Sequence, residues 1–246
     1  PGYGEDEDSA RAAALIRAAA ACPGAAVHFL SGGTQVNLTA IASMLRPYEA
    51  VIACQDGHIN THETGAVEAT GHKIFSLPGR EGKLLPTEIE TALAYHNMDQ
   101  MVMPRLVYIS QSTEWGTVYS LAELTALHEL CQKQGLLLFL DGARLGAALA
   151  AGDAALADLA QLTDAFYIGG TKNGALFGEA YVIVNPALQE GFRYQMRQRG
   201  ALMAKGWIIG LQFAELFRDK LYFDLARKAN AQAAKLKDAF LAKGYT

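Results

Sequence analysis

Residues 136–144 read Leu-Leu-Leu-Phe-Leu-Asp-Gly-Ala-Arg, an apolar run that ends in an aspartate and a glycine. A run without alternating polar residues is typical of a strand covered on both faces, so Leu136–Asp141 predicts a buried strand. The preceding segment, Ser120–Gln134, predicts a helix, because Ser120 and Glu123 form a capping-box pattern at its start. A helix that leads into a buried strand is the repeating unit of an α/β protein.

The same alternation continues in both directions along the chain. Six further segments are short and mostly apolar, as expected for strands of one sheet: Val27–Leu30, Val51–Cys54, Lys73–Leu77, Arg105–Ser110, Asp164–Ile168 and Ala180–Val184. Helical patterns lie between most of them, at 8–21, Thr34–Leu45 and Pro86–Tyr95, and one long helix is expected from Trp207 to about Lys243. We therefore expect an α/β fold with a mostly parallel sheet, in which ligands bind beyond the carboxyl ends of the strands.

Composition excludes several classes of protein. The chain has 246 residues, of which 51% are hydrophobic and 19% are charged, and its net charge is −4. Such a chain can form a core, and it lacks the apolar stretch of about twenty residues that a membrane span needs. The acidic balance argues against nucleic acid as the main partner. Three widely spaced cysteines and no visible signal peptide favour a cytoplasmic protein without disulfides or a metal site.

Two strand ends early in the chain carry candidate ligand-binding residues. Ser31-Gly32-Gly33-Thr34 leads directly into a helix, whose free N–H groups would favour an anion such as phosphate. Turns of this kind are also common without a ligand. Asp56-Gly57-His58 follows the next strand, and His58 is either an ordinary loop residue or a flat surface for an aromatic cofactor. His58 and His62 are spaced like zinc ligands, but the residues between them lack the glutamate of metalloproteases.

Two later strand ends carry charged residues. Asp141 ends the buried strand quoted above, so it either caps the following helix or pairs with a ligand cation while Arg144 holds a carboxylate. Lys172 lies in a glycine-rich segment between two expected strands. Lys172 is either an ordinary solvated surface lysine or a lysine in apolar surroundings, which loses its charge readily and can form an imine with an aldehyde.

These four strand ends together point to one cofactor. Pyridoxal phosphate (PLP) has a phosphate, an aromatic ring, a ring nitrogen that can be protonated and an aldehyde that reacts with lysine. A phosphate cradle, a stacking histidine, an aspartate and a lysine match these four groups. The sequence therefore predicts a PLP site at the carboxyl edge of the sheet.

The chain resembles the low-specificity threonine aldolases, within the β-eliminating lyase group of fold-type I PLP-dependent enzymes. The resemblance rests on SGGTQVN at 31–37, DGH at 56–58, DGARLGAAL at 141–149 and YIGGTKNGALFGEA at 167–180. It implies a three-layer α/β/α large domain with a mostly parallel seven-stranded sheet. It also implies that residues 1–220 form this PLP-binding domain. Residues 221–246 would then be a helix leading towards a small C-terminal domain that is absent from this chain.

The resemblance implies a role for each cofactor-binding residue. Gly32, Gly33 and Thr34 would hold the cofactor phosphate through backbone groups. His58 would stack on the ring and act as a catalytic base, and Asp141 would pair with the ring nitrogen.

The same resemblance assigns the remaining site residues. Lys172 would bind the cofactor covalently and is the second catalytic residue. Arg144 would contact the substrate carboxylate or the phenolic oxygen of the cofactor. Glu114 would contact the substrate, at a place where many members of the family have a histidine beside the substrate hydroxyl. Arg197 and Lys205 would reach a cofactor phosphate across a dimer interface.

The implied activity is cleavage of L-threonine or a related β-hydroxy-α-amino acid to glycine and an aldehyde. Two alternatives remain at this point. One keeps the cofactor and changes the bond that breaks, giving β-elimination, racemisation or transamination. The other is a non-catalytic α/β ligand-binding domain. By resemblance, the expected partners are a small amino-acid substrate and further copies of the chain, in a homodimer or homotetramer with shared active sites.

Overall fold

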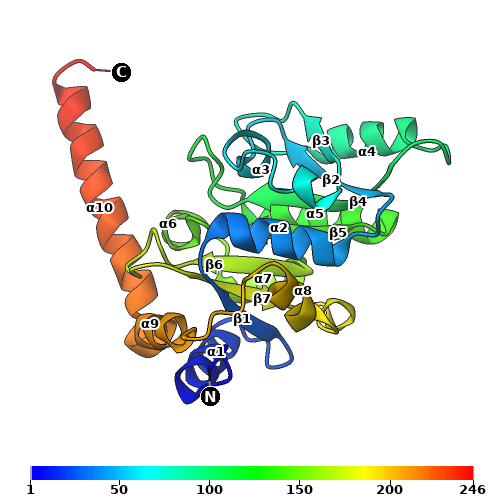
Figure 1. The fold of residues 1–246 in the computed structure, drawn as a ribbon. Coiled ribbons are helices and arrows are strands. Elements are labelled where there is room, and N and C mark those ends of the chain that lie inside the picture. The colour runs from blue at the N-terminus through cyan, green and yellow to red at the C-terminus, as the bar shows by residue number, and fades with distance from the viewer. Residues whose placement is uncertain (1, 246) are drawn as a thin grey trace.

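The computed structural model describes residues 2–245 and contains one seven-stranded mixed sheet (Figure 1). The strand order is β1-β7-β6-β5-β4-β2-β3, and within this sheet β7 runs in the direction opposite to the other six strands. All seven expected strands are present, with shifts of one or two residues at their ends: β1 (Ala26–Leu30), β2 (Glu49–Cys54), β3 (Ile74–Leu77), β4 (Met103–Ser110), β5 (Leu137–Asp141), β6 (Ala165–Gly169) and β7 (Glu179–Ile183). The predicted α/β class and mostly parallel sheet are confirmed.

Helices cover both faces of the sheet. One hydrophobic cluster lies beneath α1 (Glu7–Ala19), α4 (Pro86–Tyr95), α5 (Leu121–Gln134), α6 (Leu145–Ala151), α7 (Leu156–Leu162) and α9 (Trp207–Phe217). A second cluster lies on the opposite face, beneath α2 (Gly33–Met44), α3 (His58–Thr61) and α8 (Phe192–Gln198). Adjacent residues of β2 divide between the two clusters, since Ile52 belongs to the first and Val51 to the second. Side chains of a strand alternate between faces, so the apolar runs of the sequence serve two cores at once.

The capping box predicted at Ser120 and Glu123 is confirmed at the start of α5. The Ser120 hydroxyl accepts from the backbone N–H of Glu123 at 3.2 Å, and the Glu123 carboxylate accepts from the N–H of Ser120 at 2.7 Å. The helix ends at Gly135, whose left-handed backbone (φ 65°) turns the chain directly into β5.

The prediction of a single long helix from Trp207 to about Lys243 is wrong, because the helix is interrupted between α9 and α10 (Leu221–Ala242). Asp219 and Lys220 adopt left-handed backbone angles (φ 51° and 63°), and the buried rings of Phe217 and Tyr222 stack across the break at 5.3 Å. The break lets α9 pack against α1 and the start of α10 pack against α6. The sequence has no glycine or proline at this turn. The helical spacing of apolar residues therefore continues across it and gives no sign of the break.

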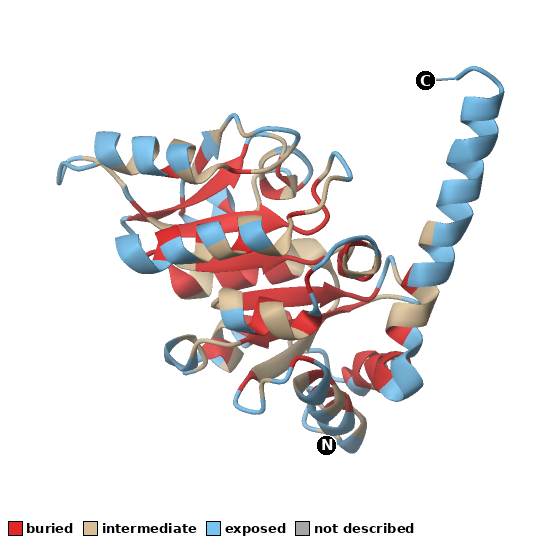
Figure 2. Cartoon of the chain, turned by 180° about the vertical axis from the view of Figure 1, so that it is seen from behind, coloured by how far each residue is buried: buried red, intermediate tan, exposed pale blue. Residues whose placement is uncertain are grey.

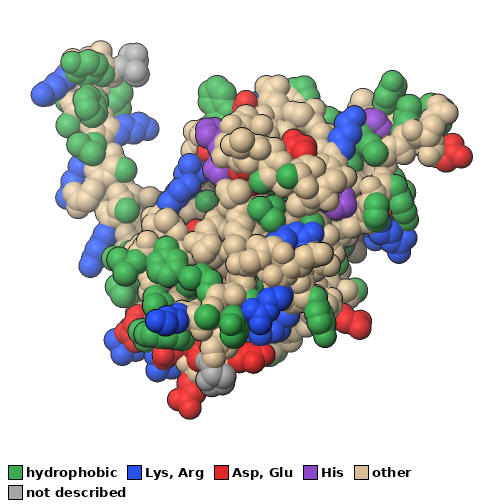
Figure 3. Space-filling model, viewed as in Figure 1, with side chains coloured by type: hydrophobic (Ala, Val, Ile, Leu, Met, Phe, Trp, Pro, Cys, Tyr) green, Lys and Arg blue, Asp and Glu red, His purple; other side chains and the backbone are tan. Residues whose placement is uncertain are grey.

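Beyond its first turns, α10 leaves the body of the molecule and is largely exposed (Figure 2). Hydrophobic and basic side chains lie along its surface (Figure 3), and Leu236, Phe240 and Leu241 are among the exposed apolar residues. The start of α10 at Leu221 coincides with the predicted boundary between residues 220 and 221. That this helix leads towards a second domain stays a prediction.

Within residues 2–245, no single helix is long and apolar enough to cross a membrane. Only α6 and α7 taken together reach that length and composition, and they are bent by 107° at the break between them. Cys22, Cys54 and Cys131 are all free thiols.

Candidate active site

The four predicted strand ends lie at one edge of the sheet, because β1, β2, β5 and β6 run in the same direction. Two further segments join them at that edge. The end of β4 pairs Ser110 with Asp141 of β5, and the start of the antiparallel β7 pairs Glu179 with Gly169 of β6. This arrangement brings residues from most of the chain to the carboxyl ends of the parallel strands, where α/β proteins bind ligands.

The N-terminus of α2 lies at this edge, directly after β1. Gly32 is the N-cap residue, with extended backbone, and the first turn of the helix contains no acidic residue. The first N–H groups of a helix have no partners within it, and its dipole favours a negative charge there. Gly33 packs so closely on β6 that an added Cβ would lie 2.9 Å from the hydroxyl oxygen of Tyr167. Gly32, Gly33 and Thr34 thus present backbone donors that could hold a phosphate.

Asp141 is buried and accepts three hydrogen bonds from neutral donors. The side-chain amide of Asn37 lies 3.0 Å from Oδ2, the hydroxyl of Tyr108 lies 2.5 Å from the same oxygen, and the N–H of Ala143 lies 3.0 Å from Oδ1. The N-cap of α6 is Arg144, so the interpretation of Asp141 as a helix cap is wrong.

No lysine, arginine or histidine in the described part of the chain forms an ion pair with Asp141. A buried carboxylate that has only neutral donors can still gain from a cationic partner. A protonated pyridine nitrogen is such a partner, so this residue fits the ring of PLP.

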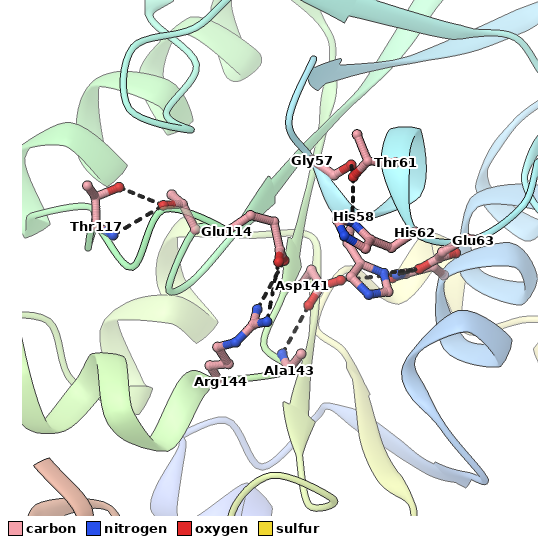
Figure 4. A network of polar contacts seen from close by, with 12 residues as sticks. Gly57, His58, Thr61, His62, Glu63, Glu114, Thr117, Asp141, Ala143 and Arg144 are labelled. Atoms are coloured by element: carbon pink, nitrogen blue, oxygen red, sulfur yellow. Dashed lines mark hydrogen bonds and ion pairs between the residues drawn. The ribbon is translucent and has the colours of Figure 1, made fainter. Parts of the chain in front are cut away.

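His58 is the first residue of α3, and its Nδ1 lies 2.8 Å from the buried Glu63 carboxylate (Figure 4). This hydrogen bond raises the pKa of His58, against the opposing effect of burial. The Glu63 oxygen that contacts His58 also accepts from Asn37 at 2.7 Å, and its second oxygen is buried without a partner. Asn37 therefore links the histidine and aspartate sites, because its amide nitrogen contacts both carboxylates.

Glu63 and Asn37 were not among the site residues expected from the sequence. Asn37 stands in the SGGTQVN motif, one helical turn after Gly33 and Thr34, which is a signal that could have placed it at the same site. Glu63 follows His58 by five residues in a short segment without clear periodicity. His62 is exposed, and its ring stacks on His58 at 5.3 Å.

We expect Glu63→Gln to lower the pKa of His58, because the substitution removes the negative charge from its hydrogen-bond partner. In the wild type, protonation of His58 stabilises the fold fully below about pH 6.5, the pKa of an unfolded histidine, and this contribution is lost as the pH rises through the higher folded-state pKa. The variant should lose stability mainly at acidic pH. Histidine titration by NMR measures the shift, with His128, which contacts the backbone oxygen of Leu162, as the internal control. An unchanged pKa at His58 would contradict this role of Glu63.

Arg144 and Glu114 form an ion pair with each other at the same edge. Two guanidinium nitrogens lie 3.0 and 3.3 Å from the two carboxylate oxygens, a bidentate geometry (Figure 4). Glu114 lies in the loop between β4 and α5 and is the more buried partner. The place on Arg144 where a substrate carboxylate was expected is thus taken by a carboxylate of the chain itself.

Lys172 follows β6 in a loop that returns to β7, and its side chain is exposed rather than surrounded by apolar groups.

Arg197 and Lys205 are also exposed. The Arg197 guanidinium lies over the ring of Tyr3 at 4.4 Å, and within residues 2–245 neither residue contacts the Asp141 network by a hydrogen bond or ion pair. Hydrogen bonds thus link His58 to Asp141 through Glu63 and Asn37, while Arg144 and Glu114 form a separate pair at the same edge. Arg197 and Lys205 lie outside both groups.

Comparison with known proteins gives a consistent result. The sequence model of a family described as beta-eliminating lyase matches residues 2–244. A low-specificity L-threonine aldolase from a Pseudomonas species is 34% identical over 232 residues, which cover 93% of this chain and 67% of that protein. The Pseudomonas aeruginosa protein of the same name is 33% identical over 240 residues, covering 96% of this chain and 69% of the relative.

Solved structures agree with these relatives. Threonine aldolase from Leishmania major superimposes with a TM-score of 0.97 at 53% identity, covering 99% of this chain and 72% of that one. An aromatic aminotransferase from Pyrococcus horikoshii has a TM-score of 0.74 at 17% identity, covering 99% of this chain and 66% of that chain, a likeness of fold alone.

Proposed function

The chain belongs to the beta-eliminating lyase family, and we propose that it is a PLP-dependent lyase that cleaves L-threonine or a related β-hydroxy-α-amino acid to glycine and an aldehyde. The observation that carries the proposal is the buried Asp141 carboxylate with neutral donors only, at the edge that also holds the α2 N-terminus and Lys172. The named aldolases among the relatives support carbon–carbon cleavage over a non-catalytic binding domain.

The residues at this edge fit the groups of the cofactor. Gly32, Gly33 and Thr34 would hold the phosphate, Asp141 would keep the ring nitrogen protonated, and Lys172 would supply the amine for the aldehyde. When bound, PLP supplies an electron sink that stabilises negative charge at the substrate Cα as the bond to Cβ breaks.

His58 is the base that removes the proton of the substrate β-hydroxyl. Glu63 accepts a hydrogen bond from Nδ1 of the ring, which leaves Nε2 of the neutral imidazole free to accept a proton. Once His58 is protonated, the Glu63 charge stabilises the cation, as the raised pKa of His58 indicates. A water molecule held by Glu114 is the alternative base.

Arg144 holds the carboxylate of the amino-acid substrate, and Glu114 competes for the same guanidinium. We expect Glu114→Gln to lower KM for L-threonine about two- to fivefold with little change in kcat, because a partly exposed ion pair is worth little and its loss frees Arg144. Steady-state kinetics distinguish a Glu114 that competes for Arg144 from a Glu114 that holds the water acting as base. A fall in kcat at unchanged KM would instead make Glu114 the group that handles the hydroxyl proton.

The products identify the bond that breaks. The protein should take up PLP, show visible absorption after excess cofactor is removed, and convert L-threonine to glycine and acetaldehyde. Release of a 2-oxo acid and ammonia would establish elimination, and conversion to the D-isomer would establish racemisation. Either product pattern without glycine would overturn the proposed aldol cleavage while keeping the cofactor.

We also propose that the active protein is a homodimer or homotetramer. Arg197 and Lys205 are exposed and stand apart from the Asp141 network, so a phosphate that they bind would belong to a second subunit. Sedimentation velocity measures the assembly directly. If Arg197→Ala weakens PLP binding in an oligomer, the shared-site arrangement is supported, whereas unchanged PLP affinity in a stable monomer would refute it.

A further inference from the structure

Glu179 is a second buried carboxylate at the carboxyl edge of the parallel strands. It is the first residue of β7 and is 5% exposed. Its Oε2 accepts from the backbone N–H of Gly170 at 2.7 Å, and its Oε1 accepts from the hydroxyl of Thr171 at 2.9 Å. Both donors directly precede Lys172 in the sequence.

We propose that Glu179 is a positioning residue for Lys172, whose carboxylate holds the backbone from which the lysine projects. This inference rests on the proposed function, because it assumes that Lys172 is the residue that binds the cofactor. Lys172 itself is exposed, so its place relative to Asp141 depends on how firmly its loop is held.

The other side of Lys172 is held by the start of α10. The side-chain amide of Asn173 donates to the backbone oxygen of Tyr222 at 2.8 Å. The buried Tyr222 hydroxyl donates to the backbone oxygen of Gly169 at 3.1 Å and accepts from the N–H of Gly146 at 3.1 Å. The residues on both sides of Lys172 are therefore held in place. Glu179 binds the two residues before it, Gly170 and Thr171, and the backbone oxygen of Tyr222 binds the residue after it, Asn173.

The loop folds back upon its first residue as well. The N–H groups of Asn173 and Ala175 both donate to the backbone oxygen of Gly170, at 2.9 and 3.0 Å. Gly170 is closely packed, since an added Cβ would lie 2.5 Å from the backbone oxygen of Gly178. Because Glu179 binds the N–H of this same glycine, the carboxylate holds the residue on which the turn is built.

A carboxylate at this position is costly for folding, which argues that it serves more than packing. Burial raises the pKa of Glu179 to about 7; the hydrogen bonds from Gly170 and Thr171 oppose this effect, and the Asp141 charge adds to it. An apolar side chain of similar size would fill the space without that penalty. What it could not do is accept the two hydrogen bonds of the lysine loop.

The test compares Glu179→Leu with Glu179→Gln and with Glu49→Leu in the full chain. Glutamine can accept from Gly170 and donate to the Thr171 hydroxyl, so it keeps the contact without the charge. Glu49 is a matched control: it is also 5% exposed, begins β2 at the opposite edge of the sheet, and accepts from the N–H of Arg46 at 2.8 Å. All variants are compared for melting temperature.

Two readouts are used, and the first needs no cofactor. We expect Glu179→Leu to speed hydrogen exchange at Gly170, Asn173 and Ala175 at least about tenfold and to raise the dissociation constant of PLP about tenfold. Glu179→Gln should stay close to the wild type in both, and Glu49→Leu should change neither beyond its effect on stability.

The proposal is overturned if Glu179→Leu leaves exchange in the loop unchanged, if Glu49→Leu affects PLP binding equally, or if Glu179→Gln is as impaired as Glu179→Leu. Failure of the proposed function looks different. In that case the wild type itself takes up no PLP, while the exchange rates of the cofactor-free variants still show whether Glu179 holds the loop.

Discussion

Replacing Lys172 with alanine is expected to abolish covalent attachment of PLP and to slow cleavage of L-threonine by at least about 10³-fold, the scale on which a catalytic proton-transfer group acts. Alanine has no amine to react with the cofactor aldehyde, whereas the residues that we propose to hold the phosphate and the ring, Gly32, Gly33 and Asp141, are unchanged in this variant. The variant should therefore still bind PLP, but release it on dialysis. Borohydride reduction followed by peptide mapping should label Lys172 in the wild type and no residue of its loop in the variant.

Lys172 is exposed, so the substitution should leave the melting temperature nearly unchanged and the loss can be assigned to chemistry. Lys133→Ala is the matched control, because Lys133 is an exposed lysine of α5 with a single long ion pair to Glu90. Added methylamine should restore part of the activity of Lys172→Ala by supplying an external amine. Full turnover in the variant without any added amine would exclude Lys172 as the catalytic lysine.

Replacing Asp141 with asparagine is expected to reduce kcat roughly 10²–10³-fold, the usual effect of removing one electrostatic contact to charge that develops in the reaction. The side chain is isosteric, and the contacts with Asn37, Tyr108 and Ala143 leave it in place. What the variant lacks is the negative charge that, in the proposed function, would keep the ring nitrogen of PLP protonated. PLP should bind with an altered absorption spectrum, and the loss should appear in kcat more than in KM.

Asp164→Asn serves as the control for the structural cost of such a change. Asp164 also accepts from a backbone N–H, that of Leu138 at 2.8 Å, and from the amide of Asn185 at 2.7 Å, but it precedes β6 at the other end of the strand. This control should reduce stability and leave kcat of the folded fraction unchanged. Equal losses of kcat in the two variants would contradict an electronic role for Asp141.

Local patterns predicted the framework of the site well. Apolar runs located all seven strands, and the Ser120–Glu123 capping box located the start of α5. Once the sheet is known to be mostly parallel, a residue that ends a strand must lie at the common edge, which is why Asp141 could be named from its position alone.

Local patterns also failed where the structure depends on packing. The helical period continues through residues 218–220, whereas the break there goes together with tertiary contacts, the stacking of Phe217 on Tyr222 and the packing of α10 on α6. The apolar residues near Lys172 in the sequence suggested apolar surroundings for its side chain, yet that side chain is exposed. Of these neighbours, Leu176 is itself exposed, and Ala175 and Phe177 pack against the hydrophobic core.

The pairing of polar side chains lies beyond any local pattern. Asn37 and Asp141 are 104 positions apart, and Arg144 and Glu114 are 30 apart, yet each pair lies within hydrogen-bond distance. Strand positions and turn residues follow from short-range sterics and from the alternation of apolar residues, which a single sequence displays. Which carboxylate binds His58, which one occupies Arg144 and which one holds the loop of Lys172 follow from burial, since a buried charge must find donors wherever the fold brings them.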